Sequence, residues 1–123
     1  MNRKTRRRAA KAGQRAGDAA PLTRRLAAHL QRARAELGAG RPADAEASCR
    51  LALQQRPDHP DALDLLGVVL MEQGRLDAAL DCFRCAAAAP GHALAEYHMG
   101  RALKRLGRLD EAVASYRRVL VSR

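Results

Sequence analysis

The sequence contains no tryptophan and few other aromatic residues. Aromatic side chains make up 2% of its 123 residues, and Phe83, Tyr97 and Tyr116 account for all of them. A hydrophobic core must therefore be built mainly from leucine, alanine and valine. That composition favours packed helices over a β-sandwich, because strands are enriched in aromatic and β-branched residues. The fold class that we predict is all-α.

Long apolar segments are also missing. No run of about 18 apolar residues is present, so the sequence predicts no membrane span. The first arginines are not followed by the apolar stretch that a secretory signal needs. We therefore expect a cytoplasmic protein.

The residue sets needed for catalysis or metal binding are absent as well. Cys82 and Cys85 form one C-x-x-C pair, but no second pair is available for a tetrahedral zinc site, and Cys49 stands alone. No serine-histidine-acid set, phosphate-binding loop or pocket of paired carboxylates can be drawn from the sequence. We expect three free thiols, no metal, no cofactor and no enzymatic activity.

Positive charge is concentrated at the N-terminus. The chain carries 23 Lys and Arg against 13 Asp and Glu, and residues 1–20 hold seven of the basic residues but only one acidic residue. Because this segment has no leucine, isoleucine, valine or aromatic residue, it cannot bury enough apolar surface to offset the entropy of ordering. We predict a disordered basic arm. It is open whether the arm is a solvated tail, a transit peptide, or a binder of nucleic acid or another anionic surface.

The remainder of the chain is repetitive. A shift of 33 residues superimposes small and aromatic positions of two copies, pairing Gly67 with Gly100, Gly74 with Gly107, Ala79 with Ala112 and Phe83 with Tyr116. A shift of 34 residues in the other direction finds a weaker copy, in which Cys49 takes the aromatic position.

Each copy predicts two helices joined by a turn. Leu66 and Leu70 lie on one apolar stripe of the first helix. Gly74 would end that helix in the left-handed conformation, and Asp77 would lie near the start of the second helix. Since a glycine inside a helix costs roughly 1 kcal/mol relative to alanine, we expect another backbone to pass close to Gly67.

This pattern of Leu66-Gly67, Leu70, Gly74 and Phe83 resembles the tetratricopeptide repeat, which has a period of about 34 residues. The resemblance implies a right-handed α-solenoid at 21–123, preceded by the basic arm at 1–20. Three helix-turn-helix repeats would occupy about 22–57, 58–91 and 92–123. The first repeat is degenerate, because Ala33 replaces the helix-crossing glycine.

The resemblance further implies a protein-interaction or scaffold module that binds a peptide or protein partner in a concave groove. Carried over to this sequence, the groove positions are Asp61, Asp64, Val68, Glu72, Tyr97, His98, Arg101, Lys104 and Arg105. Arg101 and Arg105 would anchor anions, because a guanidinium binds a carboxylate in bidentate fashion. The alternative is that these charges form the solvated face of an amphipathic helix.

Two further hypotheses concern the last helix and the rest of the protein. Val113, Leu120 and Val121 should be partly exposed, so the chain could form a homo-oligomer there or continue a longer repeat array. Repeats of this bacterial-looking type also resemble those that precede glycosyltransferase or sulfotransferase domains. The chain could therefore be the repeat portion of a larger enzyme.

Overall fold

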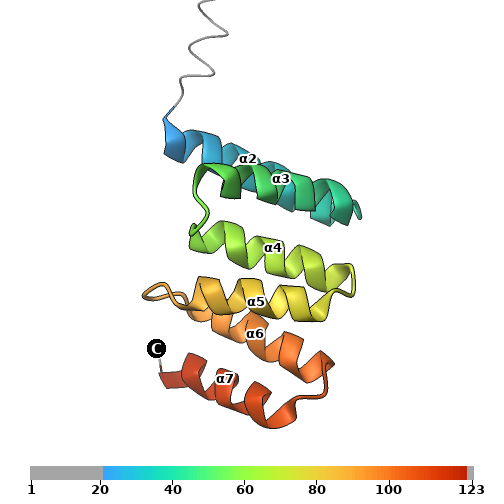
Figure 1. Cartoon of the computed structure of the whole chain (residues 1–123), viewed down its shortest axis with the longest axis vertical. Coiled ribbons are helices and arrows are strands. Elements are labelled where there is room, and N and C mark those ends of the chain that lie inside the picture. Colours follow the sequence, from blue (N-terminus) through green and yellow to red (C-terminus); the bar gives the residue numbers. More distant parts are fainter. Residues whose placement is uncertain (1–20, 122–123) are drawn as a thin grey trace, which may run out of the picture.

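A computed structural model describes residues 21–121 as a stack of helices without strands (Figure 1). The helices are α2 (Leu22–Gly38), α3 (Pro42–Gln55), α4 (Pro60–Glu72), α5 (Leu76–Ala87), α6 (Ala93–Arg105) and α7 (Leu109–Val121). The predicted all-α helical-repeat fold is confirmed. The basic arm predicted at 1–20 lies outside the described residues.

The helices form three antiparallel pairs that are stacked in chain order, from α2 at one end to α7 at the other (Figure 1). Within the described chain, α4 also approaches both α2 and α6, whereas no comparable backbone approach joins α3 to α5 or α5 to α7. The first helices of the pairs therefore lie closer together than the second helices. This unequal spacing is what gives a helical solenoid its curvature.

Left-handed glycines make the turns between the helices of each pair. Gly74 has φ 76° and Gly107 has φ 79°, a region that residues with a Cβ seldom adopt. The Gly74 N–H donates to the Met71 carbonyl at 2.9 Å, and the next N–H, that of Arg75, donates to the Leu70 carbonyl at 2.9 Å. Carbonyls at the end of α4 are thereby satisfied, so the helix ends where the sequence predicts.

The glycines in the middle of the first helices are covered by aromatic rings. A Cβ added to Gly67 would overlap the Phe83 ring of α5, and one added to Gly100 would lie 2.7 Å from Cε1 of Tyr116. The nearest atoms belong to these rings, so the contact that requires a glycine is made by a side chain of the partner helix. Each glycine makes room for the ring of its partner helix.

The hydrophobic core extends along the whole stack of helices. Its largest fully buried side chains include Phe83, Leu26, Leu70 and Leu80. Burial of one such side chain stabilises the fold by about 1.5–3 kcal/mol. Cys49 is also fully buried and takes the ring's place in the first repeat.

Candidate protein-interaction site

The nine predicted groove residues all lie on α4 or α6, two neighbouring first helices. We call the outward side chains of these two helices the first-helix surface. The structure brings some of the predicted residues together in a cleft, keeps others apart from it, and places two of them, Asp64 and His98, in the contact between repeats.

The α4 residues of this surface are of mixed exposure. Glu72 is exposed, whereas Val68 is half-buried and packs against the core. Asp61 is exposed, but its Oδ1 lies 3.0 Å from Nε2 of His92, so its carboxylate already has a partner. This end of the surface therefore offers few unpaired groups to a ligand.

Asp64 does not face outward as predicted. Its residue exposure is only 7%, and its Oδ1 lies 2.8 Å from Nδ1 of His98 on the next first helix. The His98 ring centroid is in turn 5.5 Å from that of Phe83. Asp64 and His98 thus belong to the contact between the second and third repeats, because each satisfies the other's polar atom where water has little access.

The predicted α6 residues do converge. Tyr97, Arg101, Lys104 and Arg105 line a cleft of about 460 Å³ together with Tyr116 of α7. We call this the end cleft. The Tyr97 and Tyr116 ring centroids are 6.0 Å apart, so the two rings form a continuous aromatic surface beside three cations.

The sequence-based prediction omitted Tyr116 from the site. A usable signal was present, because the 33-residue shift places this ring at the position of Phe83 and next to Gly100. Phe83 is fully buried by the third repeat, whereas within the described chain no repeat follows Tyr116, and its side chain remains half-exposed.

The cations of the end cleft are available to a ligand. Arg105 donates from Nη1 to the Met71 carbonyl at 3.3 Å, which holds its guanidinium beside α4. Arg101 and Lys104 are exposed and make no side-chain hydrogen bond or ion pair with any other described residue. All residues lining the end cleft are basic or aromatic, so its electrostatic potential favours anionic groups.

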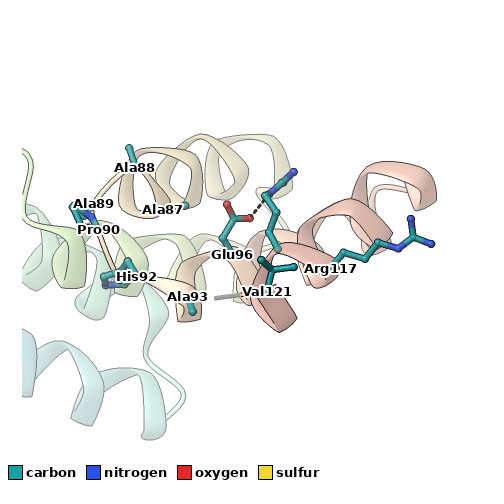
Figure 2. Close-up of a pocket in the computed structure, with 11 residues that line it drawn as sticks. Ala87, Ala88, Ala89, Pro90, His92, Ala93, Glu96, Arg117 and Val121 are labelled. Atoms are coloured by element: carbon teal, nitrogen blue, oxygen red, sulfur yellow. Dashed lines mark hydrogen bonds and ion pairs between the residues drawn. The ribbon is translucent and has the colours of Figure 1, made fainter. Parts of the chain in front are cut away.

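A second cavity, of about 490 Å³, lies between the C-terminal turn of α7 and the loop that joins α5 to α6 (Figure 2). Its walls are mostly small and apolar, including four alanines, Pro90 and Val121. Glu96 accepts a hydrogen bond from Nε of Arg118 at 3.2 Å across one side, and a dashed line at Glu96 marks this bond in Figure 2. This carboxylate is therefore already paired, and Arg117 adds a further cation to the lining.

The cysteines differ in their environment. Burial raises the pKa of the Cys49 thiol to about 12, and burial also raises the pKa of Cys82, while Cys85 is exposed. Among residues 21–121 no group of three or more His, Cys, Asp or Glu is arranged to hold a metal ion. The same residues include no helix long and apolar enough to cross a membrane.

The helical pairs are stacked, and each of the last two pairs has a contact between a glycine and an aromatic ring. These features define a helical-repeat protein. A tetratricopeptide repeat family model matches residues 30–93 and 65–123. The chain belongs to the tetratricopeptide repeat family. No curated protein matches its sequence.

Solved structures of other repeat proteins are similar. The chain is 30% identical to a mutant O-GlcNAc transferase from Thermobaculum terrenum with a TM-score of 0.78, over 83% of this chain and 20% of that one. It therefore spans about a fifth of that enzyme's length. The TPR domain of Arabidopsis FLU is 20% identical with a TM-score of 0.74, over 82% of this chain and 96% of that one.

A third similar structure is the second TPR of Spaghetti (RPAP3) bound to the HSP90 peptide SRMEEVD. It is 15% identical with a TM-score of 0.75, over 83% of this chain and 97% of that one. At such identities the FLU and Spaghetti structures support the fold alone. The family and the fold together support a protein-interaction repeat module.

Proposed function

We propose that this chain is a non-catalytic interaction module that binds a peptide or protein partner on the first-helix surface, with the end cleft as its anchor. The observation that carries the proposal is the pair of unpartnered cations, Arg101 and Lys104, beside the Tyr97 and Tyr116 rings. Arginine side chains and aromatic rings are both common among the residues that contribute most of the binding energy of protein interfaces. The cytoplasmic location of this interaction remains a prediction.

The cleft chemistry favours a carboxylate-bearing partner. A carboxylate placed in the end cleft would meet Arg101, Lys104 and Arg105 without facing any acidic side chain of the lining. Charge-assisted hydrogen bonds of this kind are roughly twice as strong as neutral ones. The RPAP3 structure contains an acidic peptide, which is consistent with this preference but concerns that protein.

The proposal is tested by affinity capture from cell extract with the wild-type chain and Arg101→Glu/Arg105→Glu. The wild type should retain partners that the double variant loses. The matched control is Arg24→Glu/Arg25→Glu, which reverses two exposed arginines on α2, outside the first-helix surface of α4 and α6. An identical set of captured proteins for the wild type and the Arg101/Arg105 variant would refute the assignment of this site.

A second candidate function is supported by the comparison with the O-GlcNAc transferase. The chain covers 20% of that enzyme at 30% identity, so these repeats could serve as the docking portion of a larger glycosyltransferase. A reading frame in the genome that continues beyond Arg123 into a transferase domain would support this function. A stop codon directly after Arg123 would remove it.

A further inference from the structure

An apolar stripe on α7 is exposed although the same stripe on α5 is covered. Leu109, Val113 and Leu120 are 59%, 47% and 67% exposed, and they lie with Tyr116 along one side of α7. Thirty-three residues earlier the corresponding side chains of α5 are Leu76, Leu80, Phe83 and Ala87. All four are buried or half-buried.

The structure shows what covers the α5 stripe. Helix α6 packs along α5 and touches α4 more lightly, so it lies in the groove between the two helices of the second repeat. His98 of α6 contacts Phe83 on one side and Asp64 on the other. In the third repeat, Phe83 corresponds to Tyr116 and Asp64 corresponds to Tyr97. Both tyrosines line the end cleft. The end cleft and the α7 stripe therefore form the corresponding docking surface for one more helix. We call such a surface the seat of that helix.

The chemistry of this seat differs from that of the seat that α6 occupies. At the positions of half-buried Val68 and buried Met71, the third repeat has Arg101 and Lys104. A purely apolar helix docked here would remove these cations from water without pairing them. Burying an unpaired charge is strongly unfavourable, so the occupant has to supply anions on that side.

From this geometry we infer that the end cleft and the α7 stripe bind an amphipathic α-helix of a partner protein, whose apolar face covers the stripe and whose flank carries Asp or Glu. This inference rests on the proposed function and specifies the partner's chemistry. The helix lies against α6 and α7 as α6 lies against α4 and α5. Its carboxylates pair with Arg101, Lys104 and Arg105.

Charge complementarity argues against a second copy of the chain as the occupant. Two copies joined tail to tail through this surface would place both sets of Arg101, Lys104 and Arg105 in one interface, and the lining of the end cleft has no acidic side chain to pair with them. A head-to-tail arrangement would place α2 on the seat, and α2 carries four arginines and a single glutamate. Like charges brought together in an interface are repulsive, so an acidic partner helix fits better.

The probe for this inference is a fluorescent synthetic peptide of about 18 residues, long enough to form a helix. It has leucines at i, i+3, i+4 and i+7 spacing on one face and glutamates on the adjacent flank. A sister peptide replaces every glutamate with lysine. Fluorescence anisotropy with the whole chain should show binding of the acidic peptide at least tenfold tighter than binding of the basic one.

Variants of the chain identify the site of binding. Arg101→Glu/Arg105→Glu and Val113→Asp/Leu120→Asp should each weaken binding of the acidic peptide at least tenfold, while Arg24→Glu/Arg25→Glu should leave it unchanged. All six positions are exposed, and circular dichroism confirms that each variant stays helical. The inference would be overturned if the two peptides bound with equal affinity. It would also be overturned if Arg24→Glu/Arg25→Glu weakened binding as much as the other two variants do. A third result that would overturn it is sedimentation showing that the wild-type chain dimerises through Val113 and Leu120.

The α7 variant also separates this inference from the proposed function. If captured partners depend on Arg101 and Arg105 but are unaffected by Val113→Asp/Leu120→Asp, the interaction module stands and the helix-docking mode is wrong. If neither variant changes the captured proteins, both are wrong.

Discussion

Gly67 of α4 lies directly against the ring of Phe83 of α5, so closely that a single added methyl group would overlap it. We expect Gly67→Ala to lower the free energy of unfolding by about 1–2 kcal/mol, because overpacking outweighs the gain in helix propensity. Gly38→Ala is the matched control, since Gly38 has no atom within 4 Å of an added Cβ. Urea unfolding followed by circular dichroism measures both.

The same pair allows a rescue test. Phe83→Leu shortens the side chain over Gly67, so Gly67→Ala/Phe83→Leu should be more stable than the sum of the two single effects predicts. Strict additivity of the two changes would show that the ring is not the group that Gly67 accommodates.

The Asp64–His98 pair should stabilise the contact between the second and third repeats. Their side chains are 10% and 15% exposed, and Asp64→Ala would leave the imidazole without its partner. We expect a loss of about 1–3 kcal/mol in unfolding free energy. Asp61→Ala is the control, because the Asp61 side chain is 62% exposed and its pairing with His92 should contribute little. If thermal unfolding showed an equal loss of stability for Asp64→Ala and Asp61→Ala, this role would be contradicted.

Glu46 should make stability depend on pH in the acidic range. A hydrogen bond from Arg50, assisted by Gln73 and Arg75, lowers the pKa of this carboxyl below its ordinary value of 4.5, although partial burial opposes the shift. A depressed pKa in the folded state means that the stabilisation is complete above the ordinary pKa and is lost as the pH falls through the folded-state pKa.

We therefore expect Glu46→Gln to cost about 1 kcal/mol at neutral pH and progressively less than that below pH 4.5. Urea unfolding at a series of pH values checks this, with the exposed Glu72→Gln as control. A cost of Glu46→Gln that grows as the pH falls would show that the sign is wrong.

The three thiols should react in order of exposure. At neutral pH the Cys49 thiolate is scarce, because its pKa of about 12 leaves roughly 1,000-fold less thiolate than an unperturbed cysteine has. Cys85 is exposed and should be alkylated first, followed by Cys82 and last by Cys49. Iodoacetamide labelling with peptide mass mapping measures the order. Equal labelling of Cys49 and Cys85 in the folded chain would contradict the structure.

The candidate site was only partly predictable from the residues. Tyr97, Arg101, Lys104 and Arg105 are brought together on one helix, because their spacing already places them on one face. As binding residues they remain predictions. Asp64 was assigned to the same outward surface by its position in the repeat, but the structure turns it towards His98, and Tyr116 was left out.

The sequence by itself determined where helices begin and end. Left-handed glycines such as Gly74, leucines at helical spacing and a glycine-aromatic pair repeated after 33 residues act over short distances, so they can be read from the residues alone. Only the tertiary structure decided which side chains face the neighbouring repeat. That choice depends on how one helical pair is rotated against the next, which follows from packing across the whole interface and not from any local pattern.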